Sequence, residues 1–170
     1  MQEASGFSFI SIATTNGDIL FSTRYTGIYP WSVPTSATDE LDSTRLSNGL
    51  EKLDRGECDT VIIAGMGAEL IVDILSNCDF VNELHLILQP MTHPEIARKY
   101  LYDNGFEINN DFIVTDAKHS YSIFDANFTG KITPKVPKDY FLGNITDFSQ
   151  KEYFLHLLII LKINQNQVPI

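Results

Sequence analysis

Residues 59–75 read DTVIIAGMGAELIVDIL, and this stretch decides the fold class. Its apolar run, Val61 to Ala64, is typical of a strand that is buried on both faces of a parallel sheet. Directly after it, apolar residues recur at helical spacing: Leu70, Ile71, Ile74 and Leu75. The stretch therefore predicts a strand that passes at once into a helix, which is half of an alternating α/β unit.

A second unit of the same kind follows. LHLILQP, residues 84–90, predicts another buried strand, and Pro90 is expected to stop it. Thr92 and Glu95 have the spacing of a capping box, which predicts the first turn of a helix. Asn104 and Gly105 predict the end of that helix, because both residues favour the backbone conformation of a C-terminal cap.

Two further strand candidates close this pattern. FEINNDFIVTD and HSYSIFDANF are separated only by a short turn around Asp116 to Lys118, which predicts an antiparallel hairpin. The order strand, helix, strand, helix, hairpin predicts the α/β class, with a parallel sheet that ends in one antiparallel strand. Ser149 and Glu152 predict the start of a last helix, whose wide apolar run YFLHLLIIL indicates a face that packs on a partner.

The composition changes near residue 45. Residues 1–44 contain 14 Ser or Thr and no Lys, although the bursts FSFISI and DILF are short strand candidates. Three segments are expected: an atypical segment 1–44, a partial Rossmann-like domain 45–148 and a C-terminal helix 149–170. Without upstream strands the sheet would expose an apolar edge, which predicts self-association through that edge or through the last helix.

Bulk properties restrict the class of protein. A chain of 170 residues with 44% hydrophobic and 20% charged residues is typical of one globular domain. Its net charge of −10 excludes a general attraction for phosphate backbones, so nucleic acid would need a local basic patch. Lys131, Lys135 and Lys138 form a modest cluster of this kind, and a solvated loop is the favoured interpretation over an RNA contact.

The expected compartment is the cytoplasm. Cys58 and Cys78 are interpreted as reduced thiols, since two cysteines without a secretory signal do not make a disulfide framework. The apolar run near the C-terminus is much shorter than the roughly 20 residues that span a bilayer, so no membrane segment is expected.

The two glycines between the first strand and its helix mark the candidate site. Gly65-Met66-Gly67 stands at the carboxyl end of a strand, where open α/β sheets bind ligands. Glycine permits positive φ and a close approach of the backbone to a ligand, but a plain tight turn has the same residues. Both interpretations stay open on this tripeptide alone, because G-x-G without a third glycine is a weak motif.

Asn48-Gly49 predicts a turn shortly before this strand. An Asn side chain there can hydrogen-bond an adenine edge, although a turn or cap residue is the more common role. No metal is expected, because His85, His93, His119 and His156 are scattered along the chain. His85 is interpreted as structural, His119 as exposed, and Asp116 and Asp125 as surface carboxylates.

The segments RLSNGLEKLDRGECDTVIIAGMGAELIVDIL and LILQPMTHPEIARKYLYDNGFEI resemble the bacterial tRNA (adenine(22)-N1)-methyltransferase family. The resemblance extends over about residues 45–130 and rests on SNGL, IAGMG, LILQP and YLYDNGFEI in this order. It implies a class I, Rossmann-like methyltransferase fold that uses S-adenosylmethionine. It also implies methyl transfer to N1 of an adenine in tRNA, with tRNA as the partner.

The resemblance implies a set of site residues. Those expected near the cofactor are Asn48, Gly49, Ala64, Gly65, Met66 and Gly67. Those expected to line the crevice for the target base are Gly65, Met66, Gly67, Gln89 and Pro90, and no catalytic residue is assigned. Family members begin with a strand and an acidic, glycine-containing loop that holds the cofactor; residues 1–44 lack this pattern, and TTNGDIL comes nearest to it.

Three functions therefore compete. The first is the tRNA adenine-N1 methyltransferase. The second is a non-catalytic remnant or interaction module that retains half of the sheet, and the third is a methyltransferase of the same fold that acts on a small molecule. The change in composition at the start of the resemblance favours a chain with foreign ends over a rebuilt or unreadable cofactor loop.

Overall fold

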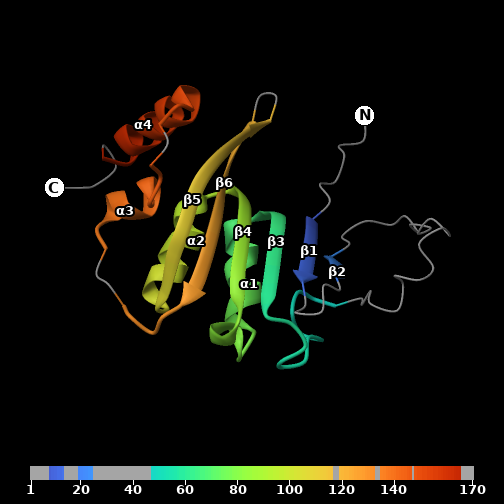
Figure 1. Ribbon diagram of the computed structural model, residues 1–170. Coiled ribbons are helices and arrows are strands. Elements are labelled where there is room, and N and C mark those ends of the chain that lie inside the picture. The colour runs from blue at the N-terminus through green and yellow to red at the C-terminus, as the bar shows by residue number, and fades with distance from the viewer. Residues whose placement is uncertain are drawn as a thin grey trace, which may run out of the picture.

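A computed structural model describes residues 8–13, 19–24, 47–116, 119–132, 135–146 and 148–165. One sheet runs through them in the order β2-β1-β3-β4-β6-β5 (Figure 1). The strands are β1 (Ser8–Ala13), β2 (Ile19–Arg24), β3 (Thr60–Gly67), β4 (His85–Thr92), β5 (Phe106–Asp116) and β6 (His119–Phe128). The helices are α1 (Ala68–Ser76), α2 (Pro94–Asp103), α3 (Pro137–Leu142) and α4 (Lys151–Gln165), with a short 3₁₀ turn η2 (Val81–Glu83).

The centre of the fold is the predicted β3-α1-β4-α2 unit. β3 and β4 are parallel, and α1 and α2 lie on the same face of the sheet (Figure 1). Burial alternates along both strands, so the expected burial on both faces is wrong: Val61 and Leu86 are fully buried, whereas Ile62 and Ile87 are half-buried. A continuous apolar run does not reveal how many faces are packed, because that depends on where the helices lie.

The predicted hairpin closes one edge of the sheet. β6 is antiparallel to both β4 and β5, and a register shift separates Ile108 from Asn110. The predicted antiparallel strand is therefore present, but β6 lies between β4 and β5, and the outermost strand β5 runs in the same direction as β3 and β4.

The opposite edge corrects an expectation. FSFISI and DILF do form strands, and β1 pairs antiparallel with β3, from Phe9 beside Ala64 to Ala13 beside Thr60. The predicted exposed edge of β3 is therefore wrong, because its hydrogen-bonding groups are paired with β1. β2 then pairs antiparallel with β1.

The end of β4 and the start of α2 also differ from the prediction. β4 continues through Pro90 to Thr92, with a register shift against β3 that accommodates the missing proline N–H. The N-cap of α2 is His93 in the left-handed conformation at φ 53°, without a side-chain cap bond. The predicted Thr92 capping box is therefore wrong, whereas Asn104 does cap the end of the helix.

A buried ion pair ties the C-terminal segment to the sheet. Arg98 of α2 is fully buried and donates to both carboxylate oxygens of Asp111 at 2.9 and 3.0 Å. It also donates to the carbonyl oxygens of Tyr140 and Phe141, each at 3.1 Å, and to Oγ of Ser122 at 3.2 Å. All five guanidinium N–H groups thus have acceptors.

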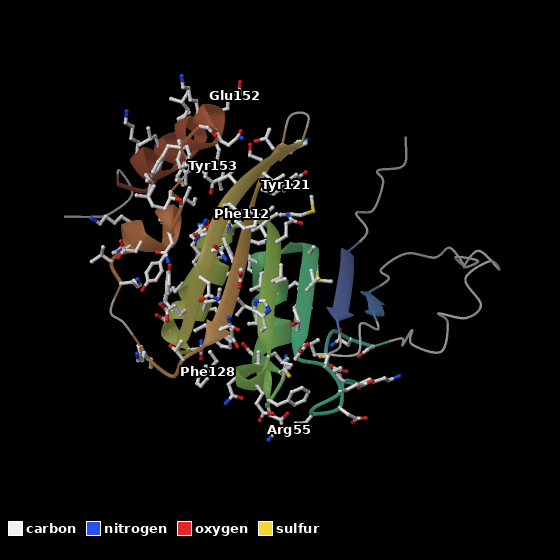
Figure 2. All side chains as sticks on the ribbon, viewed as in Figure 1. Arg55, Phe112, Tyr121, Phe128, Glu152 and Tyr153 are labelled. Atoms are coloured by element: carbon white, nitrogen blue, oxygen red, sulfur yellow. The ribbon has the colours of Figure 1, made fainter. Side chains whose placement is uncertain are left out.

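The same cluster reaches α4. The hydroxyl groups of Ser122 and Tyr153 lie 3.1 Å apart, and Figure 2 shows Tyr153 beside the upper part of the β5-β6 hairpin. No helix among the described residues has the length and apolarity to cross a membrane.

Candidate functional site

The Gly65–Gly67 junction lies where two parallel strands end side by side. β3 and β4 pair in register up to Ala64 and Gln89, and two register shifts then bring Gly67 beside Thr92. α1 begins immediately afterwards. Because β3 and β4 are parallel, their carboxyl ends lie at the same end of the sheet. Ligands of α/β folds usually bind at this end.

Gln89 holds the glycine turn in place. Gly65 has φ 77°, which other residues rarely adopt, and its N–H donates to Oε1 of Gln89 at 3.0 Å. Nε2 of Gln89 is the single buried side-chain nitrogen or oxygen without a hydrogen-bond partner in the described part of the chain. Such a group costs about 1–3 kcal/mol if it stays unpaired, so an acceptor from outside these residues is expected.

Gly67 forms the corner between strand and helix. It is the N-cap of α1 and makes no side-chain cap bond. A Cβ at this position would lie 3.2 Å from Oγ1 of Thr92 and 3.4 Å from Oε2 of Glu69. The Glu69 carboxylate already complements the positive end of the α1 dipole, so a neutral or cationic ligand group suits this corner better than a phosphate.

The predicted crevice residues divide into two groups. The side chains of Met66 and Pro90 are buried, so Met66 offers only its backbone to the junction. Four others are half-buried at the junction: Ala64, Gly65, Gly67 and Gln89.

Asn48 and Gly49 lie elsewhere. Nδ2 of Asn48 donates to Oε1 of Glu51 at 2.7 Å, within its own turn. Gly49 has φ 68°, and a Cβ there would come within 2.8 Å of Ile74, which is six residues or roughly 9 Å beyond the start of α1. The structure therefore packs this turn against the side of α1, away from Gly65 and Gly67.

A polar strip that the sequence pattern did not reveal crosses the face of the sheet away from α1 and α2. Nε2 of His85 lies 2.7 Å from Oδ1 of Asp125, and its Nδ1 lies 3.5 Å from Oγ1 of Thr60. Asn109 and Asn110 donate to the same carboxylate at 3.2 and 2.8 Å. Asp125 is therefore not the plain surface carboxylate that was expected, although His85 is structural, as predicted.

The strip predicts a pH dependence of stability. Burial tends to raise the pKa of Asp125, but hydrogen bonds from His85, Asn110 and Asn109 outweigh it and lower the pKa below its usual value. A lowered folded pKa stabilises the protein above the unfolded pKa of about 3.9, and this contribution is lost as the pH falls through the folded pKa. Urea unfolding between about pH 5 and 2 should thus show a shallower pH slope for Asp125→Asn than for the unaltered chain.

A matched control is Glu107→Gln, which removes an exposed carboxylate from neighbouring β5. The Asp125→Asn change should reduce the pH slope of the free energy of unfolding in this acidic range more than the control does. Equal slopes for the two variants would contradict the assigned role of Asp125.

The two thiols are unsuited to nucleophilic chemistry. Both cysteines are free and buried. Burial, followed by the charges of Glu57 and Asp59, raises the pKa of Cys58 to about 11, and burial also raises the pKa of Cys78. Neither thiol is an activated thiolate near neutral pH.

The loop that carries Lys131, Lys135 and Lys138 starts at the end of the sheet opposite the glycine junction. The N–H of Gly130 donates to the carbonyl of Gly105 at 3.0 Å, which places the start of this loop where α2 ends and β5 begins. Nζ of Lys135 sits 4.5 Å from the ring centre of Tyr102. Lys131 and Lys138 are exposed and Lys135 is half-buried, and the solvated loop stays a prediction. The described residues contain no group of three or more side chains suited to holding a metal ion.

Comparison with known proteins adds a family and several relatives. A family profile described as a methyltransferase domain matches residues 32–124. The tRNA (adenine(22)-N(1))-methyltransferase of Bacillus subtilis (strain 168) is 34% identical over 86 residues, which are 49% of this chain and 36% of that protein. The chain thus spans about a third of the length of this curated relative.

Solved structures share the fold. A protein of the NADB-Rossmann superfamily from Streptococcus agalactiae superposes with a TM-score of 0.62 at 28% identity, over 81% of this chain and 67% of that one. Streptococcus pneumoniae Sp1610, with a proposed tRNA (m1A22) methyltransferase activity, was solved in complex with S-adenosyl-L-methionine. It gives a TM-score of 0.56 at 25% identity over 71% of this chain and 61% of that one.

Proposed function

Because this chain belongs to the methyltransferase domain family, whose profile matches residues 32–124, we propose that it carries the site of an S-adenosylmethionine-dependent methyltransferase acting on N1 of an adenine in tRNA. The Bacillus relative carries this activity in its name, and the pneumococcal structure holds the cofactor. The proposed partners are tRNA and the cofactor, and the proposed compartment is the cytoplasm.

The observation that carries the proposal is the buried Nε2 of Gln89 at the carboxyl ends of β3 and β4. Its companion Oε1 is engaged with Gly65, so the donor is held in one direction and needs an acceptor that the described residues do not supply. An adenine presents N3 and N7 as acceptors, so a donor can hold the base there while N1 keeps its lone pair for the methyl group. The glycines and Ala64 leave the approach to this donor free of long side chains.

The chemistry requires alignment more than acid-base assistance. S-adenosylmethionine, when bound, supplies an electrophilic methyl group on a sulfonium, and N1 of adenine has a lone pair with which to accept it. Gly65, Gly67 and Gln89 would hold the edge of the base. The Glu69 carboxylate would favour a positively charged group at the corner that Gly67 forms. Alignment alone is worth about 7–11 kcal/mol of barrier at best. Because N1 lies on the Watson–Crick edge, the base must be unpaired or turned out of its stack.

The orientation of β1 favours a second candidate, a non-catalytic remnant or interaction module. β1 is antiparallel to β3, so Ala13 lies beside Thr60, and Ile19 lies beside Ala13. Ala13 and Ile19 therefore both lie at the end of the sheet opposite the junction. TTNGDIL, the nearest match to the expected cofactor loop, spans residues 14–20, and its residues 14–18 lie outside the described part of the chain.

The proposed organisation keeps an atypical segment 1–44, a partial methyltransferase domain 45–148 and a C-terminal helix 149–170. A small-molecule methyltransferase of the same fold is the third candidate, and it would use the same junction. Proposed site residues at the junction are Ala64, Gly65, Met66, Gly67, Gln89 and Pro90; a cofactor role for Asn48 and Gly49 would need them to leave their present packing.

Calorimetric titration with S-adenosylmethionine tests the proposal. We expect saturable one-to-one binding that weakens more than about tenfold in Gly67→Leu, because the new side chain would fill the corner beside Thr92 and Glu69. Gly67 has negative φ, so this change does not strain the backbone. Gly56→Ala is the control, since Gly56 has no atom within 4 Å of its added Cβ.

Three outcomes separate the candidates. Binding together with transfer of labelled methyl to N1 of adenine in tRNA supports the proposed activity. Binding with turnover only on a free nucleoside or metabolite would indicate the small-molecule enzyme. A sample that is folded by circular dichroism but does not bind S-adenosylmethionine would refute the enzyme proposal and leave the interaction module.

A further inference from the structure

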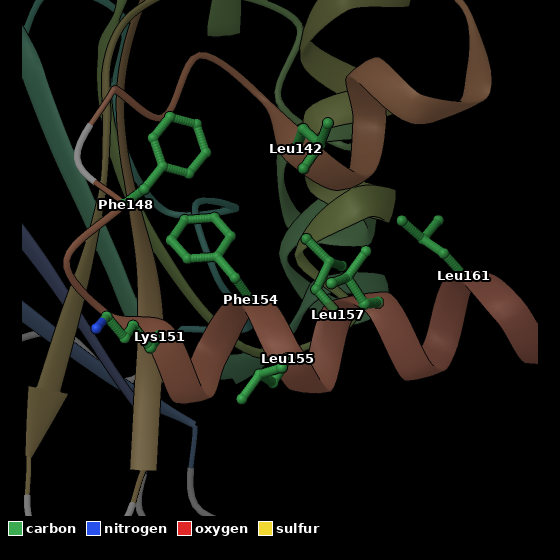
Figure 3. A pocket seen from close by; sticks show the side chains of 8 residues that line it. Leu142, Phe148, Lys151, Phe154, Leu155, Leu157 and Leu161 are labelled. Atoms are coloured by element: carbon green, nitrogen blue, oxygen red, sulfur yellow. The ribbon is translucent and has the colours of Figure 1, made fainter.

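An apolar groove of about 400 Å³ runs between α4 and the segment before it (Figure 3). Leu142 of α3 faces Phe154 and Leu157 of α4 across the groove, and the rings of Phe148 and Phe154 pack with their centres 4.8 Å apart. The whole lining is Leu142, Phe148, Lys151, Phe154, Leu155, Leu157, Leu158 and Leu161. Lys151 is the one charged member of this set.

The outer surface beside the groove is apolar as well. Leu155, Leu158 and Ile159 of α4 are 60%, 53% and 56% exposed, and Phe148 is 59% exposed. Together with Leu142, these side chains form a group of exposed large apolar residues, and contiguous apolar surface of this kind is typical of contact sites. Leu157 on the opposite side of α4 is buried, so the helix is apolar on both faces and its packing within the chain uses one of them.

We propose that this outer face binds a second copy of the same chain, with the two α4 helices antiparallel. The twofold axis passes through the outer face, between Leu155 and Ile159, at the level of Leu157 along the helix. Such a contact is self-complementary, as in most soluble dimers. Leu155 precedes Leu157 by as many residues as Ile159 follows it, so each Leu155 meets the partner's Ile159. The proposal is independent of whether the glycine junction binds a cofactor.

The charges on the helix specify this pairing. Glu152 and Lys162 are both exposed and lie ten residues apart, roughly 15 Å along the axis. In an antiparallel pair about Leu157, each Glu152 faces the partner's Lys162. A parallel pair would instead place like charges together, with Glu152 on Glu152 and Lys162 on Lys162.

Local charge also permits the approach of two acidic molecules. The net charge of −10 acts against association in general. The exposed face of α4, however, carries Lys151 and Lys162 against Glu152, so the contact itself is not acidic. The helix dipoles oppose each other in an antiparallel pair, which adds a small favourable contribution.

The available area suits a weak dimer. Stable complexes bury about 800 Å² on each partner, whereas this face consists of one side of α4 with Leu142, Phe148 and the stems of the flanking lysines. We therefore expect a dimer that dissociates in the micromolar range.

Sedimentation equilibrium of the full chain from about 1 to 200 µM tests the proposal. We expect a monomer–dimer equilibrium that is lost in the double variant Leu155→Glu, Ile159→Glu. Both side chains are more than half exposed, so the monomer should stay folded, as circular dichroism would verify. Phe112→Ser is the control, because Phe112 is 44% exposed on β5 and should leave the dimer unchanged.

A charge swap between Glu152 and Lys162 tests whether the molecule that binds this face is a second copy of the chain. Glu152→Lys alone and Lys162→Glu alone should each weaken the dimer about three- to tenfold, since the twofold axis doubles each effect. Combining the two changes should restore the wild-type constant. A folded chain that is monomeric at 200 µM would overturn the proposal, and so would a dimer that the combined variant fails to restore.

Discussion

Replacing Arg98 with methionine is expected to lower the free energy of unfolding by about 3–5 kcal/mol. The change leaves the Asp111 carboxylate buried without its bidentate partner, and it removes the donors for the carbonyl groups of Tyr140 and Phe141. The loss should also loosen α3, because Arg98 is one of the links between that helix and α2, beside the ring contact of Tyr102 with Tyr140. Urea unfolding followed by circular dichroism measures the change.

Two comparisons show whether the buried charge is responsible. Lys99→Met, one residue along α2, removes an exposed cation paired with Asp103 and should change the free energy of unfolding far less. The double variant Arg98→Met, Asp111→Leu should recover a large part of the loss, since a buried ion pair is replaced by apolar groups. A loss in Arg98→Met no greater than that in Lys99→Met would show that the ion pair contributes little.

Gly143→Ala is expected to be about as costly as Arg98→Met, because its methyl group collides with the same ion pair. Gly143 has φ 59°, and a Cβ there would lie 1.9 Å from Oδ2 of Asp111 and 2.5 Å from Nε of Arg98. Neither atom can move away without breaking the ion pair. The methyl group would therefore displace either the turn after α3 or the pair itself.

Gly56→Ala isolates the part of this cost that comes from the backbone. Gly56 also has positive φ, at 81°, but no atom lies within 4 Å of the added Cβ. Its substitution should cost only the backbone strain, about 1–2 kcal/mol. Similar melting temperatures for the two alanine variants would refute the proposed collision at Gly143.

The pattern of apolar residues was a reliable guide to the order of elements. β3, α1, β4, α2 and the β5-β6 hairpin all appear where the periodicity of residues 59–128 predicts them, and the resemblance to the tRNA (adenine(22)-N1)-methyltransferase family is confirmed by the relatives found. Periodicity is a local property, and so these elements are recognisable without knowledge of their neighbours.

Apart from the end of β4 and the start of α2, the errors concern contacts between distant segments. The pairing of β1 with β3 joins residues about 50 positions apart, and nothing in the residues of FSFISI specifies which strand it joins or in which direction. The burial of Arg98 is similar: the helical pattern of α2 gives no sign that this arginine points inward, because its partners come from β5, β6 and the α3 turn.

The candidate site also combines features that the sequence predicted with features that only the tertiary structure shows. Gly65, Gly67 and Gln89 stand out in the sequence by residue type and by their position after apolar runs, and the parallel pairing of β3 and β4 brings them together. Asn48 and Gly49 were expected beside them but pack on α1 instead. The hydrogen bond from Gly65 to Gln89, and the unpaired donor that it leaves, depend on a register shift that no sequence pattern announces.

The sequence by itself determined the α/β class, the parallel β3-β4 pair, the closing hairpin and the methyltransferase family, because these follow from local periodicity and from motifs read in order. Only the tertiary structure decided which edge of β3 is paired, where the ion pair of Arg98 lies and which polar atom at the junction lacks a partner. Each of these depends on contacts between segments far apart in the chain, where register and direction are set by the packing of the whole sheet.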